Sequence, residues 1–176
     1  LSANRVRIIG AAHRSRILRF PPRPGLRPPP DRVRETLFNW LGQDLSGLEC
    51  LDLFAGSGAL GFEAISRGAR NVVLVESDRL AYEALRKNAA ALGCQGSVEL
   101  VRADALEFVH DLDRGFDIVF LDPPFGSGVL EHLAVALPNL TRPGGLVYVE
   151  SGPGVQLDVA GWRLQRQARP GQVTYQ

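Results

Sequence analysis

One tetrapeptide carries residues whose types and order could do chemistry on a planar amine. Asp122-Pro123-Pro124-Phe125 directly follows an apolar, β-favouring segment. An exocyclic aromatic amine is a poor nucleophile, because its lone pair is delocalised into the ring. An Asp122 oxygen and the Pro123 carbonyl are both acceptors, so they could hold the two N–H bonds and aim the lone pair at an electrophile. The prolines would fix that geometry and Phe125 would stack on the ring, although a merely stiff loop is the alternative.

A glycine-rich stretch earlier in the chain predicts a cofactor loop. Gly56-x-Gly58-x-x-Gly61 lies between an apolar segment that ends at Phe54 and an apolar helical segment that starts at Ala59. We expect Gly56 and Gly58 to let the backbone approach a ligand closely, because a Cβ there would occupy the ligand's space or forbid the turn. The same pattern suits a dinucleotide, and a helix-start turn without a ligand is the alternative.

An acid follows the next apolar segment, where a nucleoside would need a hydrogen-bond acceptor. Glu76 ends the run 71–76, and we expect it to bind ribose hydroxyls. Its alternative role is a charge near the N-terminus of a helix expected over 78–92, which Ser77 or Asp78 could cap equally well.

A third strand, expected over 98–101, leads to Asp104. This carboxylate could accept a hydrogen bond from an adenine amino group or cap the helix expected over 105–112, and the sequence favours neither role. Open α/β sheets bind ligands at the carboxyl ends of their strands. Because each candidate follows a strand, the glycine loop, Glu76, Asp104 and Asp122 point to a single site.

Strands that alternate with helices predict an α/β fold built on a Rossmann-like sheet. We expect a mostly parallel sheet of seven strands with an antiparallel C-terminal strand. Beyond the elements already named, the pattern predicts a helix over 129–137 and strands over 116–121, 146–150, 162–167 and 172–175.

The N-terminal part predicts an extension to this sheet. Two short strands around the turn 10–15 indicate a small β-hairpin, and 21–30 is a proline-rich connector. Asp31 is then expected to cap a helix over 32–41. We therefore divide the chain into a basic hairpin with its connector, 1–30, and a main domain, 31–176.

Composition indicates one intracellular domain without disulfides or a metal site. At 176 residues the chain can bury one sizeable core and is too short for two full domains. Cys50 and Cys94 are too few for a disulfide framework, and the three histidines lack metal-ligand spacing. With no long apolar run or signal-like segment, we expect a cytoplasmic protein without membrane contact. Nothing in the sequence demands an oligomer, so we expect a monomer.

The uneven distribution of charge predicts a polyanionic partner. Through Glu35 the chain has nine arginines and two acids, a net charge of +7, whereas the remainder carries −6. Arginine's planar fork suits phosphate contacts and base stacking, so single-stranded or looped RNA is the expected partner. A solvated basic tail is the alternative, since Lys87 is the only lysine and arginine is the chain's usual cation.

Five arginines are the candidates for RNA contact. Two of them could instead bind a cofactor carboxylate or pair with Glu35 on their own helix. The five are Arg14, Arg16, Arg27, Arg32 and Arg34, the last two being the ones with these alternatives.

The order of the glycine loop, the two acids and the Asp-Pro-Pro-Phe motif resembles class I S-adenosylmethionine-dependent methyltransferases that modify exocyclic amines. Further segments resemble the RsmD family more specifically and span nearly the whole chain. These are Ile8-Ile9-Gly10, Leu26-Arg27-Pro28, the block 31–41 and Tyr148-Val149-Glu150-Ser151. The resemblance implies methylation of guanine N2 in bacterial small-subunit (16S) ribosomal RNA, with S-adenosylmethionine as cofactor.

Matching positions imply roles for individual residues. The cofactor's methionine and ribose parts would be lined by Asp52, Phe54, Gly56, Ser57 and Gly58, its ribose hydroxyls bound by Glu76 beside Ser77, and its adenine contacted by Asp104 and Ala105. The residues Asp122 to Phe125 would hold the guanine. The chain departs from the family where Ala11 and Ser15 replace glycines, and where Pro29 and Pro30 replace threonines.

The expected reaction is in-line transfer of a methyl group from the sulfonium to guanine N2, driven by orientation and acceptor hydrogen bonds. Three alternatives stay open. A DNA or RNA adenine-N6 methyltransferase would share these motifs, but the chain shows no inserted domain for reading duplex DNA. An NAD-dependent oxidoreductase would share the glycine loop but has no use for Asp-Pro-Pro-Phe. A non-catalytic RNA-binding module would need no cofactor pocket.

Overall fold

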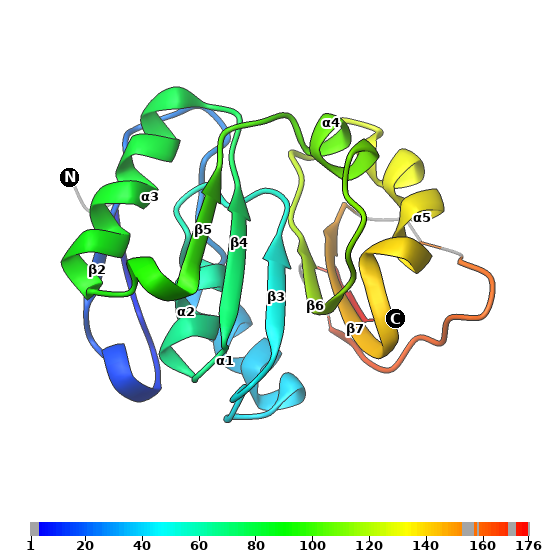
Figure 1. The fold of residues 1–176 in the computed structure, drawn as a ribbon, viewed down its shortest axis with the longest axis horizontal. Helices are drawn as coiled ribbons and strands as arrows, with labels where there is room; N and C mark the ends of the chain where they lie inside the picture. Colours follow the sequence, from blue (N-terminus) through cyan, green and yellow to red (C-terminus); the bar gives the residue numbers. More distant parts are fainter. Residues whose placement is uncertain (1–3, 153–156, 158, 169–171, 176) are drawn as a thin grey trace.

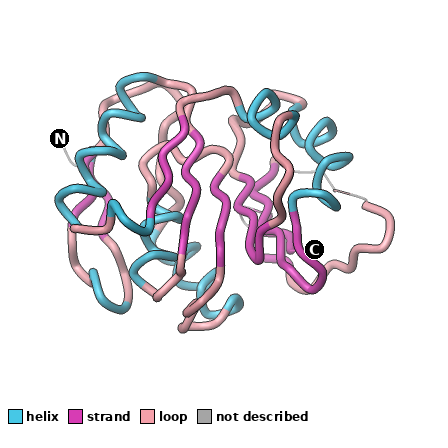
Figure 2. Tube along the Cα trace, viewed as in Figure 1, coloured by secondary structure: helices cyan, strands magenta, loops and turns pink. Residues whose placement is uncertain are grey.

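A seven-stranded sheet runs through the centre of the molecule, with helices to either side (Figure 1, Figure 2). The computed structural model describes residues 4–152, 157, 159–168 and 172–175. The strand order is β5-β4-β3-β6-β7-β9-β8. The strands are β3 (Glu49–Asp52), β4 (Asn71–Val75), β5 (Val98–Val101), β6 (Phe116–Leu121), β7 (Thr141–Ser151), β8 (Gln167–Ala168) and β9 (Gln172–Tyr175).

The predicted fold class is confirmed. Strands β3 to β7 pair in parallel, and β9 is antiparallel to both of its neighbours. The chain builds outward from β3 through β4 to β5 and then returns to place β6 on the other side of β3. This reversal creates a topological switch point at the carboxyl ends of β3 and β6, which is where such sheets bind ligands.

One predicted strand is wrong in its extent. Of the segment 162–167, only Gln167 lies in a strand, because 163–166 are exposed and β8 pairs with β9 only at Gln167 and Ala168. Without neighbours on the ladder, an alternating pattern is not enough to hold an extended segment in the sheet.

The two faces of the sheet carry separate cores. Side chains alternate along each strand, so Cys50, Phe120 and Tyr148 face one cluster, while Leu51, Leu121 and Val149 face the other. The first cluster is covered by α1 (Asp31–Leu41), α2 (Ala59–Ser66) and α3 (Arg79–Leu92), and the second by α5 (Val129–Leu140) with contributions from α4 (Ala105–His110).

The N-terminal hairpin packs into the first of these cores. Strands β1 (Arg5–Arg7) and β2 (Ile17–Arg19) pair antiparallel as a separate two-stranded sheet, so the predicted extension of the main sheet is wrong. Val6 and Leu18 turn inward, whereas the arginines beside them stay exposed. A short 3-10 helix, η2 (Ala11–His13), forms the tip. The hairpin therefore shares its hydrophobic core with the rest of the molecule.

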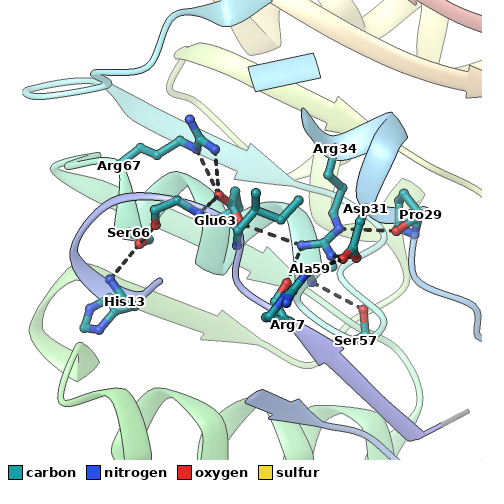
Figure 3. A network of polar contacts seen from close by, with 12 residues as sticks. Arg7, His13, Pro29, Asp31, Arg34, Ser57, Ala59, Glu63, Ser66 and Arg67 are labelled. Carbon is teal, nitrogen blue, oxygen red and sulfur yellow. Dashed lines mark hydrogen bonds and ion pairs between the residues drawn. The ribbon is translucent and has the colours of Figure 1, made fainter. Parts of the chain in front are cut away.

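A buried polar network joins the hairpin to α2 (Figure 3). The carboxylate of Glu63, on α2, accepts hydrogen bonds from the backbone N–H groups of Ile9 (2.8 Å) and Gly10 (2.9 Å). The same carboxylate pairs with Arg67 at 2.9 Å and with Arg34 at 3.6 Å, and these side chains are almost completely buried. Each buried charge has a counter-charge and hydrogen bonds, as buried ions require.

Asp31 does not cap α1 as predicted. It is the first residue of the helix, after Pro30, and its side chain makes no cap hydrogen bond. Instead its Oδ1 accepts from Arg34 at 2.6 Å and its Oδ2 accepts from Arg7 at 3.2 Å. The buried Arg34 competes successfully for this carboxylate, since a buried cation needs an anion more than a helix end needs a cap.

Candidate active site

The glycine loop lies between β3 and α2, and its backbone is left-handed at Gly56. This residue has a φ of +51°, and a Cβ built there would find nothing nearer than 3.8 Å, where Leu26 and the Phe54 carbonyl lie. The left-handed backbone accounts for glycine, whereas a Cβ there would make only ordinary van der Waals contacts. Leu26 comes from the proline-rich connector, which therefore borders the loop.

Our reason for the glycine at position 58 holds for the turn, because its backbone is left-handed, but the space that a Cβ would fill belongs to the protein. Gly58 has a φ of +78°, but a Cβ there would lie 2.5 Å from the Phe62 ring and 2.7 Å from Leu85. Its N–H is also used, because it donates to the Ala55 carbonyl at 2.7 Å. A Cβ on Gly61 would likewise overlap the side chain of Leu74. The absence of a side chain at these two glycines lets the loop and α2 pack closely against α3 and β4.

The side chains next to Gly56 are partly used by the fold. Ser57 is buried, and its Oγ accepts from the Ala59 N–H at 3.3 Å, which makes it a support for the start of α2. Phe54 is half-buried and packs against the core on the other face of the sheet. Their predicted contacts with a cofactor stay predictions.

Glu76 follows β4 and lies directly beside the glycine loop. Its Oε2 accepts from the Gly56 N–H at 2.8 Å, and its Oε1 accepts from the Asp78 N–H at 2.7 Å. Asp78 itself caps α3, through hydrogen bonds from the N–H groups of Leu80 and Ala81. Glu76 is therefore free of the capping role and is positioned by the loop, with acceptor capacity left on each oxygen. Ser77, beside it, is exposed.

Asp104 caps α4. Its Oδ1 accepts from the N–H groups of Leu106 (2.8 Å) and Glu107 (3.3 Å), so the capping alternative is confirmed. Both of these hydrogen bonds use Oδ1, so they do not exclude a ligand contact at Oδ2. Ala105 is buried behind it.

Asp52, at the end of β3, carries the clearest mark of a ligand site. Its side chain is 1% exposed, and its Oδ1 has no hydrogen-bond partner among the described residues. Burial raises the pKa of Asp52 to about 7, helped by the charge of Glu76 and opposed by the N–H groups of Phe54 and Gly61. A buried, unpaired carboxyl oxygen is costly, so its retention indicates that a bound group completes it.

The Asp122-Pro123-Pro124-Phe125 motif follows β6, at the same edge. Burial raises the pKa of Asp122 to about 8, and the charges of Glu150 and Asp52 add to the rise. Pro123 is buried and Pro124 exposed, while Phe125 leaves 71% of its surface uncovered. An aromatic ring this exposed, in the same motif as the half-buried Asp122, is suited to stacking on a planar ligand.

Four of the acids continue one face of the sheet. Along their strands, each lies two residues beyond a buried side chain of the first core: Asp52 after Cys50, Glu76 after Leu74, Asp122 after Phe120 and Glu150 after Tyr148. The parallel strands end together, so these carboxyls meet where the core stops. Sequence reasoning missed Glu150, although its spacing from Tyr148 repeats the spacing in the other three strands.

This acceptor set fits the expected S-adenosylmethionine. Carboxyls that hold their protons at neutral pH would ionise beside a positively charged ligand, and such a ligand would satisfy the free oxygen of Asp52. The acceptors of Glu76, held beside the glycine loop, suit its nucleoside part. Within the described part of the chain, no group of three or more acids, histidines or cysteines could hold a metal ion.

Four of the five candidate arginines are exposed. Arg14, Arg27 and Arg32 point to solvent, and Arg16 does so while donating one hydrogen bond to the Ala91 carbonyl. Arg34 must be withdrawn from the RNA-binding set. It is fully buried, and its guanidinium is held by Asp31, Glu63 and the carbonyls of Arg7 and Pro29. No helix in the described residues is long and apolar enough to span a membrane.

Comparisons with known proteins find relatives that match nearly the whole chain. A model of the family described as "Conserved hypothetical protein 95" matches residues 6–176. Ribosomal RNA small subunit methyltransferase D of Escherichia coli K12 is 44% identical over 181 residues, covering 98% of this chain and 89% of the relative. The protein of the same name from Haemophilus influenzae is 41% identical over 176 residues, covering 97% and 91%. The solved structure of yhhF from Escherichia coli aligns with a TM-score of 0.84 at 45% identity, covering 97% of this chain and 95% of that one.

Proposed function

Because the chain belongs to the family described as conserved hypothetical protein 95, we propose that it methylates small-subunit (16S) ribosomal RNA with S-adenosylmethionine, at N2 of a guanine. The observation that carries the proposal is the buried, unpaired carboxyl of Asp52 close to Asp122, whose motif ends in the exposed Phe125. One edge of the sheet thus holds both an aromatic ring that can stack on a base and a carboxyl that can bind a cation.

The chain's own residues supply orientation and a proton acceptor. An Asp122 oxygen and the Pro123 carbonyl accept the two N–H bonds of the guanine amine, which turns its lone pair toward the cofactor. Phe125 stacks on the base and replaces the stacking lost on extrusion. When bound, S-adenosylmethionine supplies an electrophilic methyl group on a positively charged sulfur. Once the positive charge of the cofactor has ionised Asp122, its carboxylate can take the amine proton during or after attack.

Exposed arginines support an RNA partner. Arg14 and Arg16 lie on the hairpin, Arg27 on the connector and Arg32 at the start of α1. A groove between the hairpin and the connector is lined by two further arginines, five apolar residues and one acid, namely Arg5, Arg7, Val6, Ile17, Pro28, Pro29, Pro30 and Asp31. Positive charge beside apolar surface suits phosphates and unstacked bases.

Specific observations count against the alternative functions. The curated relatives named above are called small-subunit ribosomal RNA methyltransferases, which favours neither an oxidoreductase nor a DNA-modifying enzyme. The buried, unpaired oxygen of Asp52 also argues against a binding module that has no cofactor.

The test is transfer of labelled methyl from S-adenosylmethionine to unmethylated small-subunit particles, with naked ribosomal RNA and duplex DNA as parallel substrates. The expected product is N2-methylguanosine in the RNA. Label on adenine, or on DNA alone, would overturn the proposal.

Replacing Asp122 tests its role separately. We expect Asp122→Ala to lower kcat at least ~100-fold, because both orientation and the proton acceptor are lost. The Kd for S-adenosylmethionine should change less than ~3-fold near pH 7, where this carboxyl is largely protonated in the free protein. Equal loss of turnover and affinity would contradict the assignment.

A further inference from the structure

Glu150 lies beside Asp122 at the active edge of the sheet. Strands β6 and β7 pair in parallel, with Leu121 opposite Val149, so the next position along each strand brings Asp122 next to Glu150. The charge of Glu150 contributes to the raised pKa of Asp122, which agrees with this proximity. Glu150 is half-buried and lies outside every role assigned above.

One oxygen of Glu150 is held by a hydrogen bond from the core of the protein. The hydroxyl of Tyr148, whose side chain is fully buried, donates to Glu150 Oε2 at 3.2 Å. Tyr148 packs edge-on against Phe120, so the hydroxyl that holds the carboxyl rises from a rigid part of the core. The hydrogen bond leaves Oε1 with acceptor capacity at the edge where Asp122 lies.

Two neighbouring carboxyls match the edge of guanine and mismatch the edge of adenine. Guanine presents the N1–H donor directly beside its N2 amine, whereas adenine presents the lone pair of N1 beside its N6 amine. With Asp122 on the amine, a second acceptor alongside would receive the N1–H of guanine. Against adenine it would face another acceptor, and an unpaired buried acceptor is a strong ground for rejection.

We propose that Glu150 accepts the N1–H of the target guanine and thereby selects guanine over purines that lack this donor. The inference rests on the proposed function, because it assumes that the amine held by Asp122 is guanine N2. It makes Glu150 a specificity-determining residue that contacts the substrate.

The probe is 2-aminopurine, which keeps the N2 amine of guanine but has a lone pair in place of N1–H. The modified nucleotide is first mapped in the wild-type reaction, and small-subunit particles are then reconstituted with guanine or 2-aminopurine at that position. The kcat/KM for methyl transfer is measured on both particles for the wild-type protein, Glu150→Gln and the control Glu131→Gln. Glu131 is exposed on α5 and takes no part in the site.

We expect wild-type protein and Glu131→Gln to prefer guanine at least ~100-fold, because the unpaired acceptor is penalised. In Glu150→Gln this preference should shrink at least ~10-fold, since an amide can turn its NH₂ toward the N1 lone pair. The Kd for S-adenosylmethionine should be unchanged, which separates the effect from damage to the cofactor site.

An unchanged preference in Glu150→Gln would overturn the inference, as would equal use of both bases by the wild-type protein. Failure of the proposed function is distinguishable, because in that case the wild-type protein would form no N2-methylguanosine on the unmodified particle.

Discussion

Binding of S-adenosylmethionine is expected to tighten as the pH rises, because its positive charge would meet carboxyls that are protonated in the free protein. Burial raises the pKa of Asp52 to about 7. About 3% of such a group is ionised at about pH 5.5 and about half at about pH 7. If the ligand binds only the ionised form, its association constant rises roughly fifteenfold across this window. Asp122, with a pKa of about 8, adds to the rise in the same direction.

The ligand's own groups do not titrate in this window. An α-amino group has an ordinary pKa near 8 and an α-carboxyl near 3.5, so between about pH 5.5 and about pH 7 both keep their charge. The affinity change therefore reports the protein. Calorimetric titration gives Kd at each pH, and the heat measured in buffers of different ionisation enthalpy gives the protons released.

Two comparisons test whether Asp52 and the ligand's positive charge cause the pH dependence of Kd. Asp52→Asn cannot ionise, so it should lose the part of the pH dependence that belongs to Asp52, whereas Asp111→Asn, at an exposed position, should keep it. S-Adenosylhomocysteine lacks the sulfonium charge and should show a weaker dependence. A Kd that does not change with pH, or a dependence that survives intact in Asp52→Asn, would refute the reasoning.

Three further predictions concern the hairpin and its attachment. Glu63→Ala should lower the free energy of unfolding by about 3–5 kcal/mol in denaturant titrations, because it leaves Arg67 buried without an anion and removes one of the two carboxylates that pair with the buried Arg34. Glu63→Gln should lose less, and Glu83→Ala, which breaks only an exposed pair with Arg86, should stay within about 0.5 kcal/mol of the wild-type protein; a small loss in Glu63→Ala would contradict the importance of the network. Ala11→Gly and Ser15→Gly should each stabilise the protein by about 0.5–1 kcal/mol, because these residues hold positive φ angles of 56° and 69°. Destabilisation in the same titration would mean that the turn is not strained. The slope of log K for RNA binding against log salt is negative. Replacing Arg14 and Arg16 together by Gln should reduce the magnitude of this slope by about 1.4, whereas Arg114→Gln should leave it unchanged. An unaltered slope in the double variant would remove the hairpin from the RNA interface.

The sequence predicted the sheet and the strand-end positions of the site because both follow from short-range rules. Apolar runs of strand length mark the strands, and parallel strands bring their carboxyl ends to one edge. Glu76 and Asp122 could be placed at this edge from the strand pattern alone, whereas Asp52 was named only by the family resemblance. The strained turn has a sequence signal as well, since Ala11 and Ser15 stand where the family has glycines and are the two non-glycine residues with positive φ among those described.

What the sequence could not give depends on contacts between distant segments. Arg34 lies on a helix face that looks solvated by its charge pattern, but the hairpin covers that face and buries the guanidinium. Gly58 fits a ligand-binding pattern, yet Phe62 and Leu85 explain it. In each case the deciding neighbour comes from the three-dimensional packing, and residue type alone gives no hint of it.

The raised pKa of Asp52 links the stability of the fold to occupancy of the site. In the unfolded chain this carboxyl loses its proton near pH 4, whereas in the folded protein it keeps the proton up to about pH 7. The folded state therefore binds more protons across this window, and the free energy of unfolding falls as the pH rises through it. A cationic ligand that ionises Asp52 offsets that loss. Near neutral pH, binding of a cationic ligand at this edge therefore raises the free energy of unfolding. This coupling explains why a costly carboxyl can persist in the core.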